Sequence, residues 1–285
     1  MSSWLERHPR IAWRLADLPG PTHRRIVSLV PSLSEALVRI GLGDRVVGVT
    51  AYCVEPPEAF EGLARVGGTK DADVGAILAL TPDLVIANQE ENTPRVVRKL
   101  ADAGIDVWVT YPRTVRAGAE LLAELAALGA PPAAARAVLA PIRAAIEAAE
   151  GVRDRRRAAG ERPVRVFCAI WRDPWMSVGS DTYIHDLIAL CSGANVFAET
   201  PDGAPNRRRY PIVSRAAIEA AAPEVILLPS EPYAFAELDR IDLLGLDCPA
   251  ARAGRVHLID GTLVSWYGPR IAESIRVLGP LLANP

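Results

Sequence analysis

Short apolar runs rich in β-branched residues alternate with segments of helical periodicity along most of this chain. The run Ile26 to Val30 ends at Pro31, and apolar side chains then recur at helical spacing until a glycine at 41 or 43. Ser32 or Ser34 is a candidate N-cap for that helix. Further strands are predicted at 46–49, 83–87 and 105–111, with helices at 71–82 and 93–104 between them. Short strands separated by helices predict a parallel sheet covered on both faces.

The second half of the chain repeats this alternation after a long helical stretch. Strands are predicted at 164–170, 224–229 and 255–260, and helices at 180–193, 214–223 and 269–283. Ser180 or Asp181 is the expected cap of the first of these helices. Helix-forming residues dominate 133–160, where Pro141 predicts a kink or the start of a second helix.

These elements predict an α/β fold of two Rossmann-like lobes with parallel sheets, joined by one long rigid helix. The predicted organisation is an N-terminal extension, a first lobe, a connector helix and a second lobe, at 1–23, 24–130, 131–160 and 161–285 respectively.

Composition excludes several classes of protein. The chain has 285 residues, 50% of them hydrophobic, a formal net charge of −2 and a pI near 6.1. Such a balance gives no field that favours nucleic acid or an anionic membrane. The four cysteines show no C-x-x-C spacing and the four histidines are dispersed, so no metal site built by the protein alone is expected.

The first twenty residues carry charges at Glu6, Arg7, Arg10 and Arg14 and contain no apolar core of a secretory signal. No stretch approaches the roughly 18 apolar residues that span a bilayer, so no membrane insertion is expected. The expectation is therefore a cytoplasmic protein. The alternative is a periplasmic or extracellular protein whose true start lies upstream.

In open parallel sheets, ligands bind beyond the carboxyl ends of the strands. In this sequence those positions gather aromatic residues, together with the polar run 88–92 (NQEEN) after a buried strand. The aromatic residues are Tyr52, Trp171, Trp175, Tyr233, Trp266 and Tyr267. Aromatic rings with polar edges suit a planar or largely apolar ligand.

No catalytic motif accompanies these residues. The chain has no G-x-G-x-x-G after a strand, no Walker loop and no G-x-S-x-G elbow. Cys53 follows a predicted strand and could act as a thiolate, although no histidine is near it in sequence. The chain is therefore expected not to be an enzyme.

Four sequence blocks resemble the class III periplasmic binding proteins, the helical-backbone receptors that bind cobalamin, haem and iron-siderophores for ABC importers. The blocks are 25–59, 66–87, 177–197 and 209–233, and the cobalamin-binding subfamily is the most similar. The resemblance implies a bulky metal-containing ligand in a cleft between the two lobes: cobalamin, haem or a ferric siderophore, with no intrinsic cofactor.

By position, the resemblance implies ligand contacts at Pro31, Ser32, Tyr52, Thr69, Gln89, the Trp171 loop, Tyr210 and the Trp266 loop. With the other residues that follow the predicted strands, the expected ligand contacts are Pro31, Ser32, Tyr52, Cys53, Thr69, Gln89, Glu90, Glu91, Trp171, Trp175, Tyr210, Tyr233, Trp266, Tyr267 and Arg270. Two of them depart from the cobalamin receptors, which tend to have Trp where this chain has Thr69 and Tyr210. The run 88–92 is then part of the cleft lip in the first lobe.

The resemblance also implies a surface glutamate on each lobe that docks onto permease arginines. At those positions this chain has Gly75 and Ala216, with Glu219 one turn further along. Losing both carboxylates removes two charge-assisted contacts. The leading hypothesis is a cytoplasmic binder of a small-molecule metal complex that serves no permease. The alternatives are a secreted importer subunit and a tetrapyrrole-modifying or trafficking enzyme using Cys53 or the acids of 88–92.

Overall fold

The computed structural model describes residues 8–19, 23–199 and 209–283, which divide into two compact units. The first unit comprises Met1–Pro112 with Gly118–Ala140, and the second comprises Arg113–Ala117 with Pro141–Pro285. Each unit contains its own parallel sheet, so the predicted α/β class is confirmed.

The first unit is built on a six-stranded sheet of order β1-β6-β5-β2-β3-β4, and every neighbouring pair is parallel. The strands are β1 (Ile11–Ala12), β2 (Ile26–Ser28), β3 (Val46–Val49), β4 (Ala64–Arg65), β5 (Leu84–Asn88) and β6 (Asp106–Thr110). The edge strand β1 lies within the predicted N-terminal extension and pairs with β6.

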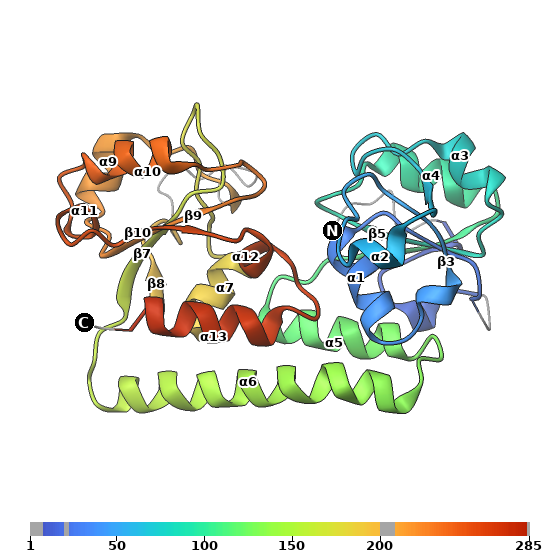
Figure 1. The fold of residues 1–285 in the computed structure, drawn as a ribbon, viewed down its shortest axis with the longest axis horizontal. Coiled ribbons are helices and arrows are strands. Elements are labelled where there is room, and N and C mark those ends of the chain that lie inside the picture. The colour runs from blue at the N-terminus through green and yellow to red at the C-terminus, as the bar shows by residue number, and fades with distance from the viewer. Residues whose placement is uncertain (1–7, 20–22, 200–208, 284–285) are drawn as a thin grey trace. The chain divides into compact units, whose positions relative to one another are not determined.

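Helices cover both faces of this sheet. They are α1 (Pro31–Arg39), α2 (Pro57–Phe60), α3 (Val74–Ala79), α4 (Pro94–Asp102) and α5 (Val115–Ala126). Figure 1 shows α3 and α4 on one face, with α1 on the other. Ile77 of α3 and Leu100 of α4 belong to one buried cluster with Val85 and Val107 of the central strands.

The second unit contains a four-stranded parallel sheet of order β10-β9-β7-β8. The strands are β7 (Val164–Cys168), β8 (Gly193–Asn195), β9 (Val225–Pro229) and β10 (Val256–Ile259). The helices are α7 (Tyr183–Leu190), α9 (Arg215–Ala220), α10 (Glu237–Leu244), α11 (Pro249–Arg252), α12 (Thr262–Ser265) and α13 (Ile271–Leu281). In Figure 1, α9, α10 and α11 lie on one face of the sheet, with α7 and α13 on the other.

Helix α6 (Pro132–Ala158) is 27 residues long and covers most of the segment predicted as a connector. Pro141 lies inside it and neither ends the helix nor starts a new one. The carbonyl of Ala137, which loses its i+4 donor to this proline, is in an exposed part of the helix, where water can replace the missing N–H. Only Ile142 and Ile146 of α6 are buried.

Both predicted helix caps are wrong. Helix α1 begins at Pro31 with Val30 as its N-cap, because proline at the first helical position needs no N–H partner. Ser34 instead donates to the carbonyl of Val30 from within the helix. Helix α7 is capped by Thr182, whose side chain accepts from the N–H of His185.

One hydrogen-bonded arrangement occurs in both units. In the first unit, Arg25 donates to the carbonyls of Leu80 and Thr81 after α3, and the carboxylate of Asp83 accepts from the Arg25 N–H. In the second unit, Arg165 and Glu224 are arranged in the same way.

Arg165 donates to the carbonyls of Ala221 and Ala222 after α9, and Glu224 accepts from the Arg165 N–H. Thr81 precedes Pro82 and Ala222 precedes Pro223; their φ values are 46° and 44°. The two units therefore share a module of strand, helix, left-handed turn and strand.

Candidate ligand-binding site

The run 88–92 forms a tight turn after β5 that its two asparagines organise. The Asn88 side-chain oxygen accepts from the N–H groups of Glu90 and Glu91, at 2.7 and 3.3 Å. The Asn92 side-chain oxygen accepts from the Asn88 N–H at 2.7 Å. Both asparagines are buried, whereas Gln89 is exposed and the two glutamates are half-buried. The asparagines are therefore the framework of the turn, and residues 89–91 are its accessible part.

This turn is connected to other strand ends of the first unit. The Asn92 amide donates to the carbonyl of Thr69 at 2.8 Å and to that of Leu29 at 3.3 Å. The Lys70 ammonium donates to the carbonyl of Glu90. The structure thus brings Thr69 together with the 89–91 turn at the carboxyl edge of the sheet.

The loop after β3 presents Tyr52 and hides Cys53. Tyr52 is 62% exposed, whereas Cys53 is fully buried. The Arg65 guanidinium on β4 donates to the carbonyls of Thr50 and Cys53, at 3.0 and 2.7 Å, and so fixes the loop. Sequence reasoning missed Arg65, because its role depends on carbonyl groups that no side-chain pattern reveals.

Cys53 is placed for packing. Its sulfur is 3.1 Å from the Ser34 hydroxyl and 3.2 Å from that of Thr50. Burial raises the pKa of the Cys53 thiol, and the two hydroxyl contacts offset only part of this effect. A buried thiol with a raised pKa is a poor nucleophile.

Pro31 and Ser32 form the first turn of α1 and are buried. Within the described part of the chain, the Ser32 hydroxyl has no hydrogen-bond partner. Both residues therefore lie beneath the surface of the first unit.

In the second unit, aromatic rings from two strand-end loops form a cluster. Trp171, after β7, meets Tyr233 edge to face at 5.5 Å, and Tyr233 packs on Phe235 at 4.7 Å. Trp175 stacks on Phe235 at 5.8 Å with an interplanar angle of 4°. Trp171 is 44% exposed, whereas Trp175 is buried. Trp171 is therefore the more exposed of the two tryptophan rings in this cluster.

An ion-pair network fixes the base of the aromatic cluster. The Arg172 guanidinium lies 5.3 Å from the Trp175 ring centroid and pairs with Asp239 and, at 3.3 Å, with Asp242. Burial raises the pKa of Asp239, but hydrogen bonds from the Ala236 N–H and from Arg172 outweigh this, so its pKa is lowered. Asp239 is therefore a charged anchor for Arg172 at neutral pH.

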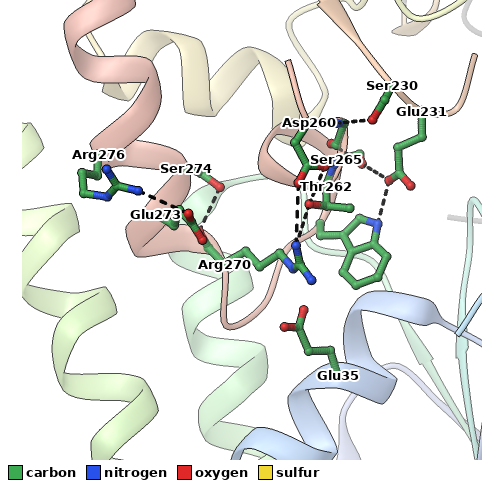
Figure 2. A network of polar contacts seen from close by, with 12 residues as sticks. Glu35, Ser230, Glu231, Asp260, Thr262, Ser265, Arg270, Glu273, Ser274 and Arg276 are labelled. Atoms are coloured by element: carbon green, nitrogen blue, oxygen red, sulfur yellow. Dashed lines mark hydrogen bonds and ion pairs between the residues drawn. The ribbon is translucent and has the colours of Figure 1, made fainter. Parts of the chain in front are cut away.

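Trp266 is held by a second network, which Figure 2 shows from close by. The Glu231 carboxylate, after β9, accepts from the Trp266 indole N–H at 2.6 Å and from the Ser265 hydroxyl at 2.5 Å. The Arg270 guanidinium lies 5.0 Å from the Trp266 ring centroid and donates to the Thr262 hydroxyl at 3.0 Å. Trp266 is only 8% exposed, so Glu231 positions a ring that lies largely within the unit.

Two further predicted residues pack elsewhere in this unit. Tyr267 is buried and meets Tyr183 edge to face at 6.0 Å. Tyr210 is half-buried, with the Arg209 guanidinium 5.7 Å from its ring centroid. The accessible candidates are therefore fewer than the sequence-based set: Tyr52, Thr69, Gln89, Glu90, Glu91, Trp171, Tyr210, Tyr233 and Arg270.

Within the described residues, no three His, Cys, Asp or Glu side chains are grouped so that they could hold a metal ion. Among those residues there is also no helix long and apolar enough to cross a membrane. The strand-end loops combine exposed aromatic rings with amides and carboxylates on rigid supports. Surfaces of this composition are typical of sites that bind small molecules.

Sequence comparison gives the family. The model of the periplasmic binding protein family matches residues 26–262, and the chain belongs to that family. It is 31% identical over 214 residues to the vitamin B12-binding protein of Yersinia pestis (strain Pestoides F), covering 75% of this chain and 72% of the relative. The predicted family resemblance is confirmed. The named relative is a binding protein, and the chain is a non-catalytic binding protein of the same family.

Solved structures agree on the fold. The periplasmic vitamin B12-binding protein BtuF of Vibrio cholerae superposes with a TM-score of 0.75 at 24% identity, over 91% of this chain and 96% of BtuF. The periplasmic haem-binding protein RhuT of Roseiflexus sp. RS-1 gives a TM-score of 0.72 at 26% identity, over 91% and 97% of the two chains.

Proposed function

We propose that the protein binds a bulky tetrapyrrole metal complex, a corrinoid or a haem, through the loops at the carboxyl ends of its strands. The observation that carries the proposal is Trp171, an exposed indole braced by Tyr233 within an ordered aromatic cluster. A macrocycle offers a broad apolar face that such a ring can stack on. The names of the relatives, which bind vitamin B12 or haem, support the same ligand class.

The metal would arrive inside the ligand. Carboxylate and amide groups at 89–91 would meet the polar periphery of the macrocycle, where amide or acid side chains are carried. Ferric siderophores are the competing ligand class, since they also carry a metal within a polar shell.

Native mass spectrometry and absorption spectra after incubation with cyanocobalamin, haemin and a ferric hydroxamate siderophore test the ligand class. We expect a one-to-one complex with one of the two tetrapyrroles. Trp171→Ala should then weaken binding by about 2 kcal/mol or more, as for an interface hot spot. Val152→Ala in α6, a residue with the same exposed fraction of 44%, is the matched control. Binding of the siderophore alone, or a Trp171→Ala variant that binds like the wild type, would refute the proposal.

We also propose that the protein acts without docking on an importer permease. Gly75 and Ala216 are both exposed, and each is the second residue of its helix, α3 or α9. They therefore occupy matching places in the module that the two units share, and neither carries a carboxylate. The Glu219 carboxylate accepts from the Asp247 N–H at 3.0 Å, so it is engaged in holding a loop.

A protein that docks on no permease has no need of an extracytoplasmic location, and we propose a cytoplasmic one. Fractionation of cells of the source organism and a pull-down with detergent-solubilised importer permeases test both points. Capture by a permease, or recovery from outside the cytoplasm, would favour a secreted importer subunit instead. The double variant Gly75→Glu/Ala216→Glu, which introduces a carboxylate at each position, should increase permease capture if the docking argument is right.

A further inference from the structure

A cavity of about 570 Å³ lies in the first unit, at the amino ends of its strands. Arg24 lies shortly before β2, and Arg45 lies immediately before β3. Both residues line the cavity. His23, also in its wall, pairs at 3.0 Å with Asp106, the first residue of β6. Because the strands of this sheet are parallel, the cavity and the first unit's own candidate loops lie at opposite ends of its strands.

The walls of the cavity are fixed by specific contacts. The segment after β1 is tied to α5, since the Leu15 N–H donates to the Glu124 carboxylate at 3.3 Å. The Arg45 guanidinium donates to the carbonyl of His23 at 3.1 Å and to that of Leu128 beyond α5. The His23–Asp106 pair is almost fully buried. The cavity is therefore an open pocket, lined by side chains from three separate parts of the chain, several of which are exposed.

The lining is cationic with an apolar side. Arg14, Arg24 and Arg45 contribute three guanidinium groups against the single carboxylate of Glu124. The Arg14 and Arg24 side chains are both exposed, and within the described residues neither has a hydrogen-bond or ion-pair partner. Leu15, Leu18 and Leu128 supply apolar surface. Guanidinium groups bind carboxylates and phosphates through paired, charge-assisted hydrogen bonds.

Several residues that line the cavity precede the part of the chain that the family model matches. The family match begins at residue 26, whereas Arg14, Leu15, Leu18, His23 and Arg24 all precede it. A volume of about 570 Å³ is within the range of small-molecule pockets. The cavity is thus formed in part by residues outside the matched range, and its volume suits a small molecule.

We propose that this cavity is a second binding site, which takes a small organic anion: an apolar or aromatic body with a doubly charged oxyanion head. The head would lie against the Arg14 and Arg24 guanidinium groups, and the body against the leucines. The site is independent of the tetrapyrrole proposal, because the two surfaces share no residue.

Isothermal titration of the full chain with phenyl phosphate and with phthalate tests the site, with benzyl alcohol as the uncharged comparison. These two probes also distinguish a phosphate head from a pair of carboxylates. We expect saturable one-to-one binding of at least one anion and none of benzyl alcohol. The double variant Arg14→Ala/Arg24→Ala should weaken anion binding at least about tenfold, as expected for losing hydrogen bonds to a charged group.

Two further variants make the test specific. Ala127→Trp, on the cavity wall, should also reduce anion binding by occupying volume. Arg95→Ala, which removes an exposed arginine from α4 in the same unit, should leave it unchanged. Circular dichroism confirms that each variant is folded, and tetrapyrrole binding should be the same in all of them. The absence of saturable binding by either anion, or binding that survives both the double variant and Ala127→Trp, would overturn the proposal.

Discussion

Replacing Glu231 tests whether a single carboxylate positions Trp266. Glu231 accepts from the Trp266 indole N–H at 2.6 Å and from the Ser265 hydroxyl at 2.5 Å. The Ser265 hydroxyl can donate instead to the carbonyl of Gly261, 2.8 Å away. Removing the carboxylate therefore leaves Ser265 satisfied but deprives a nearly buried indole N–H of its acceptor.

The magnitude follows from that difference. A hydrogen bond to a charged group contributes about 1.5–3 kcal/mol, and an unsatisfied buried donor costs about 1–3 kcal/mol. We expect Glu231→Ala to lower the free energy of unfolding of the second unit by about 2–3 kcal/mol. Glu231→Gln keeps an acceptor oxygen for the indole and should cost about 1 kcal/mol. Glu237→Ala, which breaks an exposed pair with Arg240, should cost less than about 0.5 kcal/mol.

Urea unfolding followed by tryptophan fluorescence measures these differences, with near-UV circular dichroism as a second probe of the Trp266 environment. Because the chain has two compact units, the curves are fitted with two transitions unless the two probes coincide. A Glu231→Ala variant within about 0.5 kcal/mol of the wild type would refute the reasoning. So would a Glu231→Gln variant as unstable as Glu231→Ala, since charge rather than an acceptor would then be decisive.

Three further predictions follow from the same kind of contact. The hydrogen bond from Arg162 is the main cause that lowers the pKa of Glu224 to about 2, so the stabilising contribution of the Glu224 carboxylate is present above pH 4.5 and lost as pH falls towards 2. The stability difference between wild type and Glu224→Gln should shrink over that range, and a constant difference would contradict the prediction. Asn88→Ala removes the acceptor of two N–H groups and should cost about 2 kcal/mol in thermal or urea unfolding, whereas Gln89→Ala, at an exposed position, should be neutral. All four cysteines are buried, and burial raises the pKa of Cys168 and of Cys191 to about 12. Ellman's reagent should therefore label no cysteine in the native protein and all four in urea, and rapid labelling of Cys53 in the native protein would contradict its buried position.

Seven strands and their parallel pairing could be predicted because their β-branched runs are long enough to be distinctive; they are β2, β3, β5, β6, β7, β9 and β10. Strands β4 and β8 could not be predicted, because they are short and contain no β-branched residue. β1 could not, because two residues, Ile11 and Ala12, carry no periodicity and pair only once β6 exists. The helix caps were missed for a local reason. Pro31 takes the first position of α1 and so makes Val30 the N-cap, in place of Ser32 or Ser34. Thr182 takes the N-cap position of α7, in place of Ser180 or Asp181.

For the candidate site, the sequence located the strand ends but not the exposure of the side chains on them. Trp171 and Trp175 are four residues apart, yet one is 44% exposed and the other 8%. That difference depends on Phe235 and Arg172, which pack against Trp175. Because Phe235 is 60 residues away from Trp175 in the sequence, the pattern of a single sequence does not reveal this exposure.

The shared module also constrains the kinetics of folding. The hydrogen bond from Arg25 to Thr81 spans 56 residues, and that from Arg165 to Ala222 spans 57. Closure entropy depends on the logarithm of loop length, so the two closures differ by only about 0.02 kcal/mol. Both are long-range contacts, which form after much of the intervening chain has been ordered. A large difference between the refolding rates of the two units would therefore originate outside this module, in the extra strands of the first unit or the aromatic loops of the second.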